Sequence, residues 1–291
     1  MHTIGVDIGA TKTNFVLLKD HRVLGAQKVL TPKSRKDIVS LLKMYIQKCT
    51  EIGSSRHIKG IGIGVPGPLN EKGDLILNPP NLKILRNCPL ARIVEKELKI
   101  KTKMDNDGNC FALGEALLGA GRGAKIIFGI TLGTGVGGGI VIDGKAHRGG
   151  FGSAAEVGHM TIKFDGPRCS CGSYGCLEEY VSERFFFGRG ALPQKFQERA
   201  ERGDKKALKV YDEYGRYLGI GLANVINLLD PEVVVIGGGI ANSYKFFLKE
   251  TKKEIKKRVL SPISKKYVKI KRAALGEFSG AIGAALLSQY G

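Results

Sequence analysis

The segment "IGVDIGATKTNFVLLKD" (residues 4–20) decides the fold, because "FGITLGTGVGGGIVIDG" (residues 128–144) repeats its plan. Each segment reads as an apolar strand, a turn of Gly and Thr, a second apolar strand and a polar turn. At an offset of 124 residues, Gly9 falls on Gly133. The repeat predicts an internal duplication: two similarly built α/β domains that face a central cleft, with one Gly-rich turn from each domain in that cleft.

Two nucleotide-binding motifs in the second hairpin fail on their context. "GTGVGG" (133–138) satisfies the dinucleotide pattern, which expects a helix to follow, yet the apolar run "GIVI" follows. "GIVIDGKA" (139–146) misses the P-loop pattern only at Ala146, but it occupies a strand and a turn. What remains is that glycines let backbone N–H groups approach phosphates closely, and Thr hydroxyls add donors. Hairpins without a ligand are the alternative for either turn alone; two such turns together with Asp7, a candidate Mg²⁺ partner, favour phosphate binding.

A third glycine run, "VVVIGGGIANS" (233–243), follows an apolar strand and precedes an amphipathic segment. This order predicts a strand, a loop and a helix, and a nucleotide can sit against the exposed N–H groups where such a helix begins. An ordinary strand–helix connection would have the same pattern.

Composition limits the classes of protein to consider. The chain has 291 residues, enough for one large or two moderate domains. The N-terminus has no signal-peptide pattern, and no stretch approaches the roughly 18 to 20 apolar residues of a membrane-spanning helix. We therefore expect no membrane partner and a cytoplasmic protein.

The formal net charge of +19 raises the question of nucleic acid. Residues 245–272 hold twelve Lys and Arg against two Glu, a balance of +10. Apolar residues at helical spacing (Phe247, Ile255 and Val259) predict an amphipathic helix with a basic outer face. No nucleic-acid-binding motif accompanies the charge, so a solvated face is expected rather than a nucleic-acid partner. Attraction to a polyanion remains open.

Cysteines crowd into "CSCGSYGC", where Cys169, Cys171 and Cys176 lie within eight positions. In a reducing compartment such a cluster indicates a metal site more than disulfides. His159 lies ten residues before Cys169 and completes a Cys3His set, which suits tetrahedral zinc and leaves no open position for an activated water. The sequence predicts a structural zinc ion.

The segment "IKTKMDNDGNCFALGEALLG" (100–119) changes from a strand pattern to a helical one. Asn106 and Asp107 fall where the helix begins, and Asn and Asp are favoured there as N-caps. The alternative is functional: an Asp at the mouth of the cleft, kept ionised by the helix dipole, accepts a proton from a substrate hydroxyl.

The chain resembles the ROK sugar kinases, a family within the actin-like ATPase superfamily that includes bacterial-type glucokinases, fructokinases and N-acetylmannosamine kinases. The resemblance runs nearly end to end, in family order. The motifs that carry it are "DIGATKT", "GIGIGVPGP" (60–68), "NPPNL" (78–82), "NDGNCFALGE" (106–115), "LGTGVGGG" (132–139), "AAEVGH" (154–159) and "CSCGSYGCLE" (169–178). The cysteine block with its upstream Glu-x-x-His is the most specific of them.

The resemblance implies a duplicated actin-like (ribonuclease H-like) ATPase fold of the α/β class, with two domains around a central cleft. It implies a small N-terminal domain over residues 1–115, joined by a C-terminal helix at 279–291. The larger domain would cover residues 116–278 and carry the zinc-binding loop.

The resemblance also implies roles for matching residues, with Asp107 as the catalytic base. The implied sugar-binding residues are Gly67, Asn106, Asp107, Glu156, His159 and Glu178. The implied ATP-binding residues are Asp7, Gly9, Thr11, Lys12, Thr13, Gly133, Thr134, Gly135, Gly137, Gly237, Gly238 and Gly239. Zinc would be held by His159, Cys169, Cys171 and Cys176.

These residues predict ATP- and Mg²⁺-dependent phosphorylation of a hexose, with glucose 6-phosphate as the expected product. An N-acetylmannosamine kinase or a fructokinase is the alternative within the family, and polyphosphate is an alternative donor. The alternative that is not an enzyme is a sugar-sensing ROK binding protein. The intact Asp107 and the lack of a DNA-binding extension before Ile4 argue against this alternative. Family members are commonly dimers or tetramers, so we expect a homo-oligomer.

Overall fold

The structure, a computed structural model, describes residues 1–52, 58–79 and 81–290. Pro80 of the "NPPNL" motif and Gly291, the last residue of the predicted C-terminal helix, lie outside the described residues. Contacts divide the chain into two compact units. Unit 1 comprises Met1–Gly123, Gly139–Ala154 and Ala274–Gly291, and unit 2 comprises Ala124–Gly138 and Ala155–Ala273.

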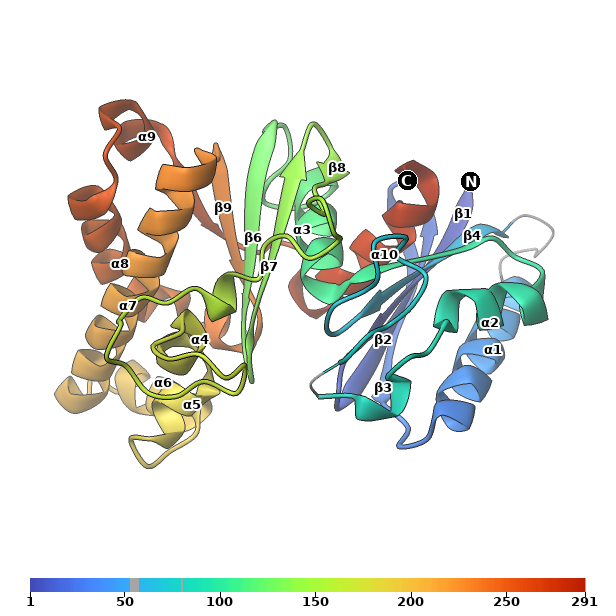
Figure 1. The fold of residues 1–291 in the computed structure, drawn as a ribbon, viewed down its shortest axis with the longest axis horizontal. Coiled ribbons are helices and arrows are strands. Elements are labelled where there is room, and N and C mark those ends of the chain that lie inside the picture. The colour runs from blue at the N-terminus through green and yellow to red at the C-terminus, as the bar shows by residue number, and fades with distance from the viewer. Residues whose placement is uncertain (53–57, 80, 291) are drawn as a thin grey trace. The chain divides into compact units, whose positions relative to one another are not determined.

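Each of the two sheets in the described residues has five strands (Figure 1). The first has the order β3-β2-β1-β4-β5 and the second the order β10-β9-β6-β7-β8. Read from its other edge, the second sheet follows the order of the first, with β6 in the place of β1 and β7 in the place of β2. The predicted internal duplication and its two opening hairpins are confirmed.

The strands β1 to β5 form the first sheet, and the helices of the first half and of the chain end complete unit 1. They are β1 (His2–Ile8), β2 (Lys12–Lys19), β3 (Arg22–Leu30), α1 (Arg35–Ile52), β4 (Ile58–Val65), η1 (Lys83–Leu85), α2 (Leu90–Leu98), β5 (Thr102–Asn106), α3 (Asp107–Leu117) and, from the chain end, η4 (Gly276–Phe278) and α10 (Ser279–Tyr290).

The remaining elements form or cover the second sheet. They are β6 (Ile126–Leu132), β7 (Val136–Ile142), β8 (Lys145–Ala146), η2 (Val157–His159), α4 (Leu177–Val181), α5 (Glu183–Phe187), α6 (Pro193–Glu201), α7 (Lys205–Leu229), β9 (Val233–Gly237), η3 (Gly239–Ser243), α8 (Tyr244–Arg258), α9 (Pro262–Tyr267) and β10 (Lys269–Arg272).

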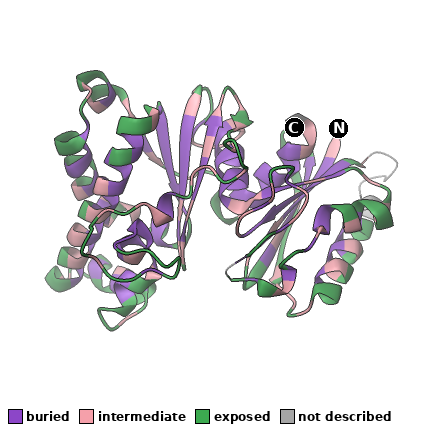
Figure 2. Cartoon of the chain, viewed as in Figure 1, coloured by how far each residue is buried: buried purple, intermediate pink, exposed green. Residues whose placement is uncertain are grey.

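The alternation "GIGIG" in β4 shows how the first sheet is covered. Ile61 and Ile63 are fully buried in the core that α1 and α2 complete. Gly60 and Gly62 face α10, which packs along β1 and β4, whereas Gly64 faces Cys110 of α3. A Cβ on Gly62 would lie 1.6 Å from the backbone oxygen of Ala284, so only glycine permits this contact. Figure 2 shows β1, β2 and β4 mostly buried, whereas the edge strand β3 and the outer faces of the helices are exposed.

In unit 2, α7 and α8 pack against each other, and aromatic residues fill the space around them. Phe186, Tyr211 and Tyr214 are fully buried, and the ring centroid of Phe186 lies 5.6 Å from that of Tyr211 and 5.3 Å from that of Tyr214. The predicted amphipathic helix is confirmed as α8, in which Phe247 and Ile255 are buried. The basic segment is not one helix, because α9 and β10 follow α8. No helix in the described part of the chain is long and apolar enough to cross a membrane.

Candidate functional site

The junction of β5 and α3, in unit 1, presents the predicted base. Asn106 is the N-cap, and its Oδ1 accepts the N–H of Gly108 at 2.8 Å. The same N–H reaches Oδ1 of Asp107 at 2.9 Å. Asn106 also donates from Nδ2 to the carbonyl of Gly67 at 3.3 Å. The predicted helix start is confirmed, and it places the Asp107 carboxylate in the first turn, where the helix dipole favours negative charge.

Asp7 lies on β1, in the same unit as Asp107. Burial raises the pKa of the Asp7 carboxyl to about 7, the negative charge of Asp107 adds to the rise, and a hydrogen bond from Asn14 opposes it. The Asp107 carboxylate is therefore close enough to disfavour the ionisation of Asp7. A divalent cation would relieve this repulsion, and carboxylate oxygens are ligands that suit Mg²⁺.

Hydrogen bonds within the turn and from Thr31 hold the turn between β1 and β2. The N–H of Gly9 donates to the carbonyl of Lys12 at 2.9 Å, and Thr31 donates from Oγ1 to the carbonyl of Gly9 at 2.7 Å. The hydroxyl of Thr13 is buried and lies 2.9 Å from that of Thr31. Thr13 thus supports the turn, whereas Thr11 and Lys12 are exposed where a ligand can reach them.

Two predicted nucleotide-binding segments of unit 2 meet at the ends of neighbouring strands. β6 and β9 are parallel, and Thr131 pairs with Gly237. Gly238 has φ +85°, and a Cβ there would lie 2.3 Å from the backbone oxygen of Leu132. The loop of Gly237, Gly238 and Gly239 therefore lies against the start of the Gly133–Gly137 turn.

The loop at Gly237–Gly239 differs from the predicted strand, loop and helix in one respect. The 3-10 helix η3 stands between the loop and α8. Its first turn closes when the N–H of Ala241 donates to the carbonyl of Gly238 at 3.1 Å. The N–H groups near the loop are therefore those of a 3-10 turn, not those of α8.

Glu178, a predicted sugar-binding residue, is hydrogen-bonded to the glycine turn at Gly133–Gly137 inside unit 2. Its Oε2 accepts the N–H of Val136 at 2.9 Å, and its Oε1 lies 3.7 Å from Nη1 of Arg184. The next helix adds a second tie, because Glu183 donates its N–H to the carbonyl of Gly133 at 2.8 Å and accepts from Oγ1 of Thr134 at 3.3 Å. The turn from Gly133 through Gly135 to Gly137 is therefore fixed by the segment that carries Glu178.

Glu156 and His159 lie at the two ends of the short helix η2, next to Glu178. Desolvation raises the pKa of the Glu156 carboxyl, His159 lowers it, and the charge of Glu178 raises it further. These three predicted sugar-binding residues therefore interact electrostatically within unit 2. Gly67, Asn106 and Asp107 form the matching set in unit 1.

The predicted zinc ligands converge on one point. The ligand atoms of His159, Cys169, Cys171 and Cys176 all lie within 4.8 Å of one another. The Sγ atoms of Cys171 and Cys176 are 3.7 Å apart, as are Sγ of Cys169 and Nδ1 of His159. Tetrahedral zinc with bonds of about 2.3 Å to sulfur places two sulfurs about 3.8 Å apart, so the four residues fit the ion. A backbone hydrogen bond from Ser173 lowers the pKa of the Cys171 thiol, whereas burial raises the pKa of the Cys169 and Cys176 thiols.

Comparison with known families decides the relationship. The model of the ROK family matches residues 3–290. The chain belongs to the ROK family.

ROK proteins of more than one kind are similar to this chain. The glucokinase of Streptomyces coelicolor is 33% identical over 312 residues, covering 99% of this chain and 97% of the relative. The xylose repressor of Bacillus subtilis is 32% identical and covers 97% of this chain and 75% of the repressor. Among solved structures, the ROK glucokinase of Streptomyces griseus in complex with glucose and AMPPNP matches with a TM-score of 0.85, at 33% identity and full coverage of both chains. The predicted actin-like ATPase fold is confirmed.

The sequence did not predict a role for two acidic residues. One is Glu115, the last residue of the motif "NDGNCFALGE", and the other is Asp105, directly before it. Glu115 is fully buried and accepts hydrogen bonds from Ala274, Leu275 and Ser279. Asp105 directly precedes the predicted site residues and is also buried. An acidic residue inside an otherwise apolar helix was the one available signal for Glu115, because a buried carboxylate needs partners.

Proposed function

We propose that this ROK protein transfers the γ-phosphoryl group of ATP to a hexose, with glucose as the preferred acceptor at O6 and Asp107 as the general base. The chain is a sugar kinase; the choice of sugar and the role of Asp107 are the proposal. The observation that carries it is the position of Asp107 in the first turn of α3, beside an N-cap anchored to Gly67. The similarity to glucokinases over almost the whole chain supports glucose as the acceptor.

The chemistry requires a proton acceptor and charge neutralisation. Asp107 would accept the hydroxyl proton while the sugar oxygen attacks the γ-phosphorus and the bond to the β-phosphate oxygen breaks, releasing ADP. Mg²⁺, when bound, would neutralise the phosphate charge, and Asp7 is the residue we expect to hold it. Backbone N–H groups of the turns at Gly9 and Gly133 would bind phosphate oxygens. Sugar binding would need to exclude water, which can otherwise accept the phosphoryl group.

Zinc would act on structure and not on the reaction. Its four proposed ligands complete a tetrahedron, so no position remains for a reacting water. The same loop carries the sugar-binding candidates, since Glu156 precedes His159 by three residues and Glu178 follows Cys176 by two. Nδ1 of His159 faces Cys169, which leaves Nε2 for a sugar hydroxyl.

A sugar-sensing protein without kinase activity is the second candidate, because a xylose repressor is among the relatives. The two functions differ in one measurable property, the release of ADP. N-acetylmannosamine, fructose and polyphosphate remain the alternative substrates. We further propose a cytoplasmic homo-oligomer, a dimer or tetramer, which sedimentation would test.

The deciding experiment is a coupled assay of ADP release over a panel of hexoses with ATP and Mg²⁺. We expect the largest kcat/KM for glucose, with polyphosphate a poorer donor than ATP. Saturable sugar binding without ADP release from any sugar would favour the sensor instead.

A further inference from the structure

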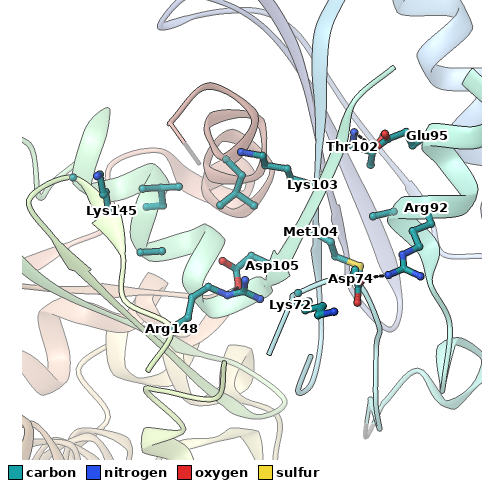
Figure 3. Close-up of a pocket in the computed structure, with 16 residues that line it drawn as sticks. Lys72, Asp74, Arg92, Glu95, Thr102, Lys103, Met104, Asp105, Lys145 and Arg148 are labelled. Carbon is teal, nitrogen blue, oxygen red and sulfur yellow. Dashed lines mark hydrogen bonds and ion pairs between the residues drawn. The ribbon is translucent and has the colours of Figure 1, made fainter. Parts of the chain in front are cut away.

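Arg148, in unit 1, is half-buried and forms an ion pair with the buried carboxylate of Asp105. Its Nε lies 3.4 Å from Oδ1 of Asp105, whose side chain is 5% exposed. Figure 3 shows the two side chains pointing toward each other from β5 and from the segment after β8. Nε and Nη2 of Arg148 are buried, and neither has a hydrogen-bond partner among the described residues. The pairing with Asp105 is therefore what offsets the loss of hydration on this edge of the guanidinium.

Asp105 in turn holds the start of α3. The Oδ1 atom that faces Arg148 also accepts the N–H of Asn106 at 2.7 Å and Nδ2 of Asn109 at 3.0 Å. These two partners lie on either side of Asp107 in the sequence. One carboxylate oxygen thus connects Arg148 with the backbone immediately before the proposed base and with the helix turn that follows it.

The turn at Gly73 leaves room for the Arg148 guanidinium. The pair lies on the wall of a cavity of about 660 Å³, so part of its surroundings is open (Figure 3). The turn at Gly73, which has φ +69°, also lines this cavity. A Cβ on Gly73 would lie 2.3 Å from Nη2 and 2.5 Å from Nη1 of Arg148. The absent side chain at Gly73 leaves the space that the planar guanidinium fills.

The charges around this point are mostly negative. Burial raises the pKa of the Cys110 thiol; the charges of Asp105, Asp7 and Asp107 add to the rise, and that of Arg148 opposes it. Three carboxylates and this guanidinium therefore act on the same small volume. A cation here reduces the repulsion that would otherwise push Asp105 away from Asp107.

We infer that Arg148 is a positioning residue for phosphoryl transfer: through Asp105 it fixes the Asn106 N–H and the Asn109 side chain, and so the backbone that presents Asp107. This inference rests on the proposed function, because it takes Asp107 as the base. Arg148 itself contacts neither sugar nor phosphate in this account. Its loss should therefore lower kcat and leave substrate binding nearly unchanged.

The kinetic test compares Arg148→Gln with Arg92→Gln. Arg92 lines the same cavity and pairs with Asp74, but its side chain is 70% exposed. We expect Arg148→Gln to lower kcat per folded molecule at least about tenfold with both KM values within about threefold, because small displacements of a reacting group are costly. Arg92→Gln should stay within about twofold of wild type. An unchanged kcat in Arg148→Gln, or an equal loss in both variants, would overturn the inference.

Rescue separates positioning from general destabilisation. Asp105→Asn added to Arg148→Gln removes the unpaired buried carboxylate and keeps an oxygen that can accept the Asn106 N–H. The double variant should recover kcat to within about fivefold of wild type, since the two changes are coupled. If it is no more active than Arg148→Gln alone, the inference is wrong.

Amide hydrogen exchange tests the inference without any activity. In Arg148→Gln the amides of Asn106 and Gly108 should exchange at least about tenfold faster, whereas those of strand β9, in unit 2, should not. Unchanged exchange at Asn106 would overturn the inference. If the wild-type protein phosphorylates no sugar, the proposed function fails, and exchange alone decides whether Arg148 holds this junction.

Discussion

The hydroxyl of Ser279 donates a hydrogen bond of 2.8 Å to Glu115, a fully buried carboxylate 164 residues earlier in the chain. The same carboxylate accepts the N–H groups of Ala274 at 3.0 Å, Leu275 at 2.9 Å and Ala120 at 2.9 Å. Within unit 1, Glu115 thus fastens the end of α3 to the segment that leads into α10.

We predict that Glu115→Ala lowers the free energy of unfolding by about 3 kcal/mol or more, because buried donors lose their acceptor. Glu115→Gln keeps one acceptor oxygen and should cost less. Urea unfolding measures both, with Glu198→Ala as an exposed control expected to change stability by less than about 0.5 kcal/mol. A stability of Glu115→Ala equal to that of the control would show that these bonds contribute nothing.

The sequence predicts a contact well when the two partners lie close together along the chain. The repeated hairpins predicted the duplication because strand alternation and turn glycines are local. Asn106 and Asp107 were placed at a helix start because capping depends on neighbouring residues. The cysteine cluster was readable for the same reason, since its four members lie within 18 positions.

Partners far apart in the chain left no such signal. Nothing in the pattern around Glu115 points to Ala274 or Ser279, and nothing around Arg148 points to Asp105. These contacts exist because the tertiary fold brings the segments together. The adjacency of the Gly133 turn and the Gly238 loop likewise depends on β6 and β9 being neighbours, which strand patterns alone do not specify.

Asp7 predicts a dependence of stability on pH. Its pKa is raised to about 7 in the folded protein, against 3.8 as the ordinary value, so the folded state binds the proton more tightly. The stabilising effect is complete below about pH 4 and is lost as the pH rises toward 7. Asp7→Asn should therefore gain stability relative to wild type between pH 5 and 8, by at most about 4 kcal/mol.

Thermal unfolding of both proteins from pH 5 to 8 measures this difference. Mg²⁺ should raise the melting temperature of wild type more at pH 8 than at pH 5, because it competes with the proton at Asp7. A stability difference independent of pH would contradict the raised pKa.

Loss of the proposed zinc ion should weaken sugar binding but not ATP binding. Cys171→Ser should remove about one zinc ion per chain and raise the sugar KM at least about tenfold, because the metal orients the residues beside its ligands. Binding of ATP at the glycine turns should persist. Ser170→Ala, between two of the ligands, is the matched control and should keep its zinc. Elemental analysis and calorimetry supply the measurements; a wild-type protein without zinc, or a zinc-free variant with unchanged sugar affinity, would refute the assignment.

If the basic face of α8 is only solvated, removing its charges should not change the kinase reaction. Four of its exposed lysines lie in the second half of the helix: Lys252, Lys253, Lys256 and Lys257. Changing all four to Gln should leave kcat and the KM for ATP within about twofold, because exposed charges interact weakly in water. Specific DNA or RNA binding at physiological salt that disappears in this variant would reverse the assignment of a solvated face.

The central claim is that Asp107 accepts the proton of the sugar hydroxyl. Asp107→Asn keeps the shape of the side chain and removes the acceptor, and Asp143→Asn is the control, since Asp143 lies in an exposed turn at φ +48° that Asn tolerates. The most direct measurement is kcat for glucose phosphorylation alongside calorimetric glucose affinity. The account predicts that Asp107→Asn lowers kcat at least about 100-fold while glucose affinity stays within about tenfold. Near-wild-type turnover in the purified, folded variant would contradict it.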